Sequence, residues 1–136
     1  MNTAENNETP VIRLSSVVLD CRDAVALSEF YIRLLGWKRN DGEGDVWVDI
    51  VAPNGGTLIG FQKNEDYVPP VWPEEPDAQQ QMVHLDFAVR GKEQLEPAVR
   101  HAIACGATQA SVQYGPGCWV TMIDPEGHPF CFIVGN

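Results

Sequence analysis

The segment SEFYIRLLGW, at residues 28–37, carries the clearest periodic pattern in the chain. Five apolar residues in and around it fall at positions i, i+3, i+4, i+7 and i+8: Leu27, Phe30, Tyr31, Leu34 and Leu35. This spacing places them on one face of a helix. Asp23 is a suitable N-cap for that helix and Gly36 a suitable C-terminal stop. The segment therefore predicts an amphipathic helix between Asp23 and Gly36.

Strand patterns lie on both sides of this helix. The preceding stretch, Val11–Asp20, is rich in β-branched residues and predicts one strand. Three further strands are expected after Gly36: Trp37–Asn40, Asp45–Ala52 and Thr57–Lys63. The turn-forming sequences Asp-Gly and Pro-Asn-Gly-Gly separate them. The first half of the chain is thus a βαβββ unit.

The same order returns in the second half. Gln81–Arg90 predicts a strand, and a second helical stripe ends at Gly106. Pro97 fits this helix only in its first turn, so the helix should begin near Gln94. Three more strands are then expected: Thr108–Gln113, Cys118–Asp124 and Pro129–Val134.

The repeated pattern predicts an α+β fold built from two βαβββ modules. Module one covers about residues 10–63, a Pro-rich linker about 64–80, and module two about 81–135, within one domain over residues 1–136. Each unit covers only one face of its sheet with a helix, so the uncovered faces can enclose a cleft. We expect a cup-shaped, mainly antiparallel sheet with both helices outside.

Composition narrows the classes of partner. The net charge of −10 disfavours nucleic acid and membrane surfaces as partners, because both are anionic. No stretch approaches the roughly 18 continuous apolar residues of a membrane span. The polar start MNTAENNETP lacks the features of a signal peptide, and the four cysteines form no CxxC pair. We expect a cytoplasmic protein with reduced thiols.

Three segments resemble the vicinal oxygen chelate superfamily: SEFYIRLLGW, HLDFAV at residues 84–89 and WVTMIDPEGHPFCFI at residues 119–133. That superfamily includes glyoxalase I, bleomycin-resistance proteins, fosfomycin-resistance enzymes and extradiol dioxygenases. The helix end FYxxLLGW and the turn DPEG are the most specific parts, and the resemblance spans about residues 10–135. It implies the double-module cup and a homodimer, with modules paired within a chain or exchanged between chains.

The resemblance also implies a divalent metal inside the cup, held by one inward side chain from each of four strands. The matching positions here are Ser16, Gly60 with Gln62 on the same face, His84 and Cys131. This set suits neither Mg²⁺ nor Mn²⁺, which prefer oxygen ligands. For zinc, His84 and Cys131 fall short of the three protein ligands usual in catalytic sites. We expect no metal or other cofactor, and the alternative is one divalent ion held by His84 and Cys131.

Strand alternation indicates which side chains face the cleft. In HLDFAV, Leu85 and Phe87 should pack under a helix, so His84 and Asp86 should point the other way. The pair has two interpretations: a catalytic base oriented by a carboxylate, or a histidine satisfied by a hydrogen bond. His128, in the turn after Gly127, is expected at the surface.

Further candidates for ligand contact are polar or aromatic residues on inward strand faces or in the linker. They are Ser16, Trp47, Gln62, Trp119, Cys131, Tyr67 and Trp72. Tyr67 and Trp72 stand in the Pro-rich linker, where they can form a lid over the cup or a subunit contact. Gln62 and Trp119 are expected near His84.

These residues favour a protein that binds an aromatic or amphipathic small molecule in a cup without a catalytic metal. The alternative is a glyoxalase-like lyase or isomerase that uses His84 with Asp86, or a weakly held divalent metal. A third reading, an interaction protein with a vestigial cup, leaves the inward polar groups unexplained. Fold alone does not choose among them, because function depends on the site.

Overall fold

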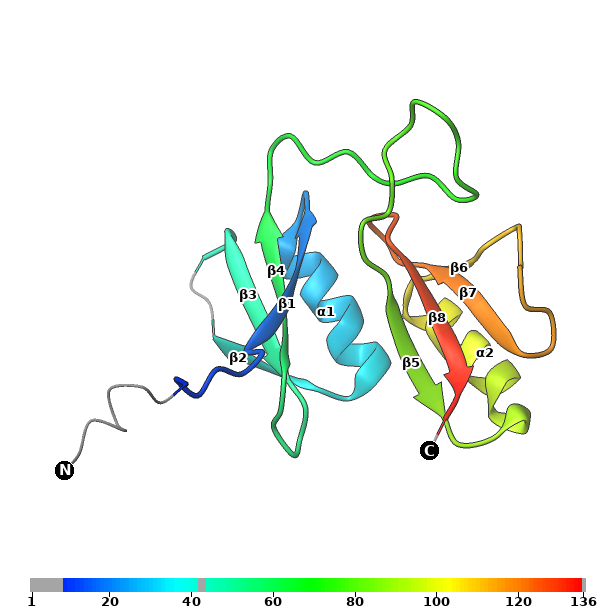
Figure 1. Ribbon diagram of the computed structural model, residues 1–136, viewed down its shortest axis with the longest axis horizontal. Helices are drawn as coiled ribbons and strands as arrows, with labels where there is room; N and C mark the ends of the chain where they lie inside the picture. Colours follow the sequence, from blue (N-terminus) through cyan, green and yellow to red (C-terminus); the bar gives the residue numbers. More distant parts are fainter. Residues whose placement is uncertain (1–8, 42–43, 136) are drawn as a thin grey trace.

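The computed structural model describes residues 9–41 and 44–135. In the first module, β1 (Ser16–Cys21) and α1 (Ala24–Leu35) precede β2 (Lys38–Asp41), β3 (Trp47–Val51) and β4 (Leu58–Lys63). In the second, β5 (Leu85–Val89) leads through one 3-10 turn, η2 (Lys92–Gln94), into α2 (Leu95–Cys105). The last strands are β6 (Thr108–Gln109), β7 (Trp119–Ile123) and β8 (Pro129–Val134). Figure 1 shows the modules side by side, with the linker arching over one end.

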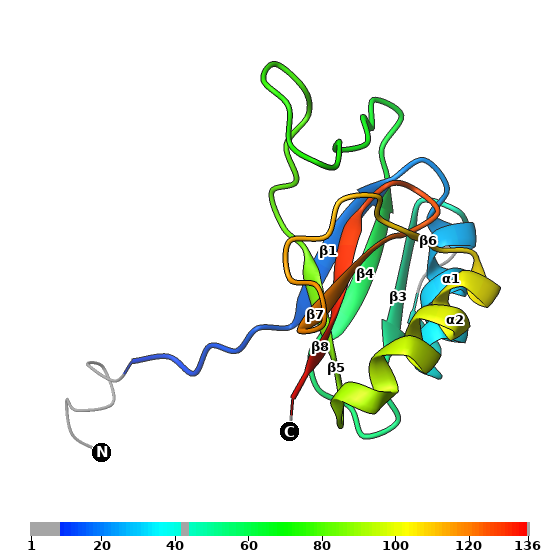
Figure 2. The ribbon, with the colours of Figure 1, turned by 90° about the vertical axis from the view of Figure 1, so that its right-hand side faces the viewer.

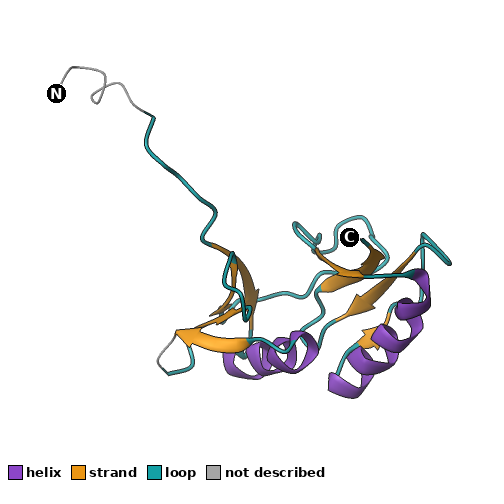
Figure 3. Cartoon of the chain, turned by 90° about the horizontal axis from the view of Figure 1, so that it is seen from below, coloured by secondary structure: helices purple, strands orange, loops and turns teal. Residues whose placement is uncertain are grey.

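Each module forms one four-stranded sheet of the same topology. The strand orders are β1-β4-β3-β2 and β5-β8-β7-β6. The pairs β1–β4 and β5–β8 are parallel and the others antiparallel. Both helices lie on the same side of the sheets (Figures 2 and 3). The predicted α+β fold of two βαβββ modules, with helices outside a mainly antiparallel arrangement, is confirmed.

Several strands are shorter than the sequence patterns indicated, because their partners end. The first strand begins at Ser16, since its partner β4 starts at Leu58. In the second module, Leu85 opposes Phe130, and the preceding Pro129 has no N–H to extend the ladder. Residues 81–84 are therefore not in a strand. Alternation in side-chain composition predicts where a strand can form but not where its partner stops.

The ends of α1 follow the predicted caps. The Asp23 carboxylate accepts a hydrogen bond from the Ala26 N–H at 3.0 Å. Gly36 ends the helix in the left-handed region at φ 69°, where a side chain would be strained. The second helix begins at Leu95, which places Pro97 in its first turn as expected. Among the described helices, none is long and apolar enough to cross a membrane.

One continuous core joins the modules through the inner face of α1. Tyr31 is fully buried, and its ring lies 5.6 Å from Phe61 in the first sheet. The same ring lies 6.1 Å from Phe130 and 6.2 Å from Phe87 in the second sheet. Aromatic rings at these separations interact favourably beyond their buried area. The packing of α1 therefore depends on side chains from both modules.

A buried ion pair reinforces this junction. His128 is nearly buried, which corrects the expectation that it lies at the surface. Its Nδ1 lies 2.8 Å from the fully buried Asp124 carboxylate, and its Nε2 lies 2.7 Å from the Asp20 carbonyl oxygen in β1. A carboxylate and a carbonyl can only accept, so these contacts favour a ring that donates from both nitrogens, which is the positively charged form.

The Asp124 carboxylate also accepts from three other donors. Tyr31 donates its hydroxyl at 2.8 Å, and the backbone N–H groups of Glu126 and His128 donate at 2.9 and 3.0 Å. Burial opposes a charged imidazole, but Asp124 and the Asp20 carbonyl outweigh it and raise the pKa of His128. The turn at residues 124–128 therefore links module two to α1 and β1 of module one through hydrogen bonds.

Candidate functional site

A pocket of about 390 Å³ opens on the face of the second sheet that points away from α2. Strands β7 and β8, the start of β5, the linker and one loop all contribute to it. Its lining consists of Trp72, Gln81, His84, Asp86, Tyr114, Trp119, Thr121, Pro129, Cys131 and Ile133. The volume lies within the usual range for small-molecule sites.

Strand register explains why these side chains share one face. Asp86 pairs with Cys131 across the parallel β5–β8 ladder, and Thr121 pairs with Cys131 across the antiparallel β7–β8 ladder. Residues opposite one another in a sheet project to the same side. The alternate residues Phe130 and Phe132 are buried in the core instead. This is the division between the two faces that the sequence alternation predicted.

The floor of the pocket is polar. His84 Nε2 lies 3.2 Å from Asp86 Oδ1, and both side chains remain nearly half exposed. Beside them, the Thr121 hydroxyl lies 3.4 Å from the Cys131 sulfur. Burial and the nearby Asp86 carboxylate raise the pKa of the Cys131 thiol, although the hydrogen bond with Thr121 opposes this. A raised pKa keeps this thiol protonated and makes it a poor nucleophile at neutral pH.

The walls are aromatic and held in place. Trp72 donates its indole N–H to the Val112 carbonyl at 2.8 Å, and its ring meets Tyr114 edge-on at 5.3 Å. The Trp119 ring lies so close to Gly115 that an added Cβ there would fall 2.3 Å from it. Only glycine can occupy that position without moving the ring. Trp72, although it stands in the linker, thus lines the pocket of its own chain.

Other predicted residues lie elsewhere. Trp47 and Gln62 oppose one another on the first sheet, where the Trp47 ring covers Gly60. Ser16, at the start of β1 in the same sheet, pairs with Leu58. Tyr67 donates its hydroxyl to the Glu126 carbonyl at 2.9 Å and stacks on His128, so it belongs to the junction between the modules. None of these residues lines the pocket of the second sheet.

Two lining residues had no clear signal in the sequence. Tyr114 stands in the loop before β7, and Gln81 stands in the extended segment before β5. Tyr114 lies in a loop, which shows no periodicity from which an inward direction could be inferred. Gln81 was expected to begin the strand Gln81–Arg90, where alternation would place it on the same side as Leu85. The aromatic character of Tyr114 beside a Gly-Pro-Gly turn was the only available cue.

The structure changes the count of possible metal ligands. His84, Asp86 and Cys131 each offer one ligand atom, and these atoms lie within 4.8 Å of one another. The resemblance to the vicinal oxygen chelate superfamily implied only His84 and Cys131 as ligands in this module. An imidazole, a carboxylate and a thiol together suit a zinc-type ion with three protein ligands. These three donors, all from the second module, therefore fit a divalent metal ion such as zinc.

Comparisons with known proteins agree with this architecture. Residues 16–133 match the model of the glyoxalase-like domain family. A glyoxalase/bleomycin resistance protein/dioxygenase family enzyme from Burkholderia phytofirmans is 26% identical, with a TM-score of 0.68 over 89% of this chain and 97% of that one. A possible glyoxalase from Bacillus cereus is 15% identical, with a TM-score of 0.67 over 90% and 99% of the two chains.

A lactoylglutathione lyase from Agrobacterium tumefaciens is also 15% identical, with a TM-score of 0.63 over 93% of this chain and 96% of that one. Among curated proteins, none matches the sequence. At such identities the lyase and the Bacillus protein show similarity of fold alone.

Proposed function

The chain belongs to the glyoxalase-like domain family, and we propose that it binds a small molecule in the pocket of its second sheet. The observation that carries the proposal is an aromatic pocket of about 390 Å³ with a short polar floor. Trp72 is held by its hydrogen bond to the Val112 carbonyl and Trp119 packs against Gly115, so a flat ligand can enter with little reorganisation of these two walls. We propose that no resident metal is needed for this binding.

Loss of the pocket imidazole is expected to weaken binding rather than folding. In His84→Ala, the ligand loses one polar partner, which should reduce its affinity by about 1–3 kcal/mol. Thermal stability should change little, because His84 is nearly half exposed and its contact is to a side chain exposed to the same degree. Calorimetric titration with the copurified ligand, together with thermal unfolding, measures both quantities.

The matched control for binding is His101→Ala, which removes an exposed histidine on α2 whose ring contacts the Leu34 carbonyl of α1 at 3.1 Å. Binding should be unchanged in that variant. If His84→Ala lowers stability while affinity is retained, His84 is structural and the proposed role of the pocket floor fails.

The second candidate function is a lyase or isomerase, favoured by the grouping of three ligand-type side chains. In this reading His84, Asp86 and Cys131 hold one divalent metal, which would polarise a substrate carbonyl as a Lewis acid. Without a metal, His84 acts as a general base oriented by Asp86. In both cases the aromatic walls would orient the substrate against these groups.

Native mass spectrometry before and after chelator treatment separates these proposals. We expect a copurified organic mass that survives the chelator, metal well below one equivalent per chain, and a homodimer as the main species. Nearly one equivalent of metal that is lost in His84→Ala would instead establish the metal-dependent reading. A mass equal to the bare chain, with no ligand and no metal, would contradict both.

A further inference from the structure

We propose that the ligand of this pocket is an organic cation, with an ammonium or amidinium group on a flat apolar body. The inference rests on the proposed small-molecule function and specifies the class of ligand. It follows from three properties of the lining: its hydrogen-bonding atoms, its aromatic faces and its charge.

The polar atoms of the lining call for a hydrogen-bond donor. The Asp86 carboxylate is nearly half exposed at the floor of the pocket. Gln81 Oε1 is buried without any hydrogen-bond partner, alone in this respect among the described side chains. An unpaired buried acceptor costs free energy, and Gln81 lines this pocket as well as a neighbouring one, so a ligand N–H group that reached the oxygen would recover that cost. An anionic ligand would face the like charge of the Asp86 carboxylate.

The aromatic part of the lining suits a flat, positively charged group. Three aromatic side chains, Trp72, Tyr114 and Trp119, line the pocket together. The negative face of an aromatic ring attracts a cation, and tryptophan does so most strongly. The same rings supply the contact area for an apolar ligand body. A neutral ligand would gain the contact area of the rings but not their attraction for a positive charge.

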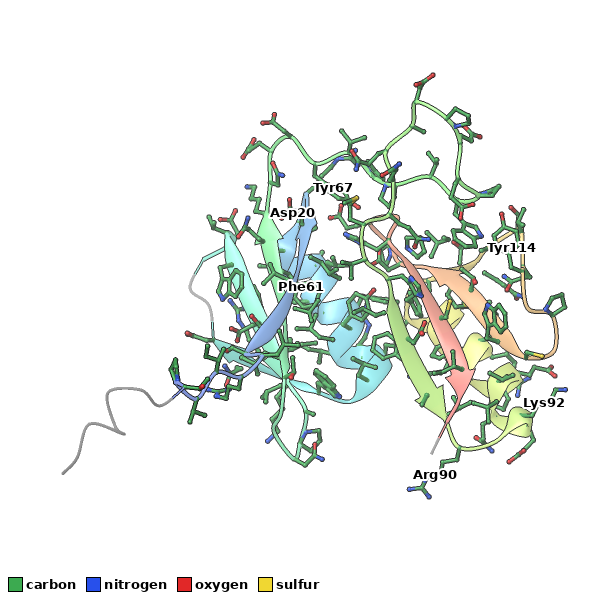
Figure 4. All side chains as sticks on the ribbon, viewed as in Figure 1. Asp20, Phe61, Tyr67, Arg90, Lys92 and Tyr114 are labelled. Atoms are coloured by element: carbon green, nitrogen blue, oxygen red, sulfur yellow. The ribbon has the colours of Figure 1, made fainter. Side chains whose placement is uncertain are left out.

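The one formally charged residue in the lining, Asp86, is negative. None of the lining residues is a lysine or an arginine, and His84 is the only basic side chain among them. At the rim, Glu74 accepts a hydrogen bond from the Tyr114 hydroxyl at 3.2 Å. Arg90 lies at the opposite end of the module from Tyr114 (Figure 4), whereas the Lys92 ammonium lies outside the lining, beside Gly117 in the loop between Tyr114 and Trp119. With the net charge of −10, this field attracts cations and repels anions.

The test uses three probes of one shape and different charge: benzamidine, benzamide and benzoate. Each is titrated into the full chain, with quenching of tryptophan fluorescence and calorimetry as readouts. We expect benzamidine to bind about ten-fold more tightly than benzamide, and benzoate not to bind, because charge-assisted hydrogen bonds are about twice as strong as neutral ones. Raising the salt concentration should weaken benzamidine alone.

Two variants locate the effect. Asp86→Asn should abolish the preference for benzamidine over benzamide, whereas Gln81→Leu should weaken both probes. The matched control Glu29→Gln removes the same charge from an exposed position on α1 and should leave the preference intact.

The outcomes distinguish this inference from the proposed function. Equal affinity for benzamidine and benzamide, or an unchanged preference in Asp86→Asn, would overturn the cation inference while leaving a small-molecule pocket in place. Failure of all three probes to bind at millimolar concentration would also overturn it. In that case a copurified ligand in native mass spectrometry would show that the proposed function still holds.

Discussion

Asp124→Ala is expected to lower the free energy of unfolding by about 3–5 kcal/mol, because it removes one partner of a buried charge pair. The change leaves the His128 imidazolium without its counter-charge in a nearly dry site. It also removes the acceptor of the Tyr31 hydroxyl and of two backbone N–H groups. Chemical denaturation monitored by tryptophan fluorescence measures the loss.

The matched control is Asp45→Ala, which breaks an exposed ion pair with Lys63. Exposed pairs contribute between zero and about 1 kcal/mol, so this variant should be close to the wild type. If both variants lose a similar amount of unfolding free energy, the buried ion pair at the module junction contributes no more to stability than an exposed one.

The pH dependence of stability identifies the responsible group. Because the folded-state pKa of His128 is raised, its contribution is fully present below its ordinary value of 6.5 and is lost as pH rises through the folded value. Wild-type stability should therefore fall between about pH 6.5 and that higher value. The same decline should be much smaller in Asp124→Ala, since the strongest of the groups that raise the pKa of His128 is gone.

Phe130→Ala should cost a comparable 3–5 kcal/mol, the usual range for a phenylalanine removed from a packed core. Phe130 is fully buried, and its ring lies 6.1 Å from Phe30, 6.1 Å from Tyr31 and 5.9 Å from Phe87. The cavity would open where α1 of one module meets the sheet of the other. Thermal and denaturant unfolding should show a single transition at lower midpoint.

Val134→Ala provides the control on the same strand, because that side chain is 45% exposed. Its effect should stay within about 0.5 kcal/mol. If Phe130→Ala also falls in that range, the two modules have separate cores and α1 does not couple them.

The fold could be predicted because its signals are local. The helical stripe in SEFYIRLLGW, the caps at Asp23 and Gly36, and the turn residues all act within a few positions. Their repetition indicated two modules of the same order. The ends of strands were predicted less well, since they depend on partners far away in the sequence, such as Leu58 for β1.

The candidate site could be predicted in part. Alternation placed His84, Asp86, Trp119 and Cys131 on one face, and the structure brings them into one pocket. No sequence pattern could show that Trp72 reaches the Val112 carbonyl, because that contact depends on the path of an irregular linker. The burial of His128 was missed for a similar reason: its partner, the Asp20 carbonyl, lies 108 positions away.

The unequal use of the two modules also bears on how such a protein can change. In the first sheet, the Trp47 ring covers Gly60, one of the predicted metal-ligand positions, whereas the second sheet carries the aromatic pocket of about 390 Å³. Two modules of the same topology thus differ in which one bears the aromatic pocket. Substitutions at Trp72, Gln81, Tyr114 and Trp119 would therefore change the shape and polarity of the pocket without removing side chains from the aromatic core that both modules share.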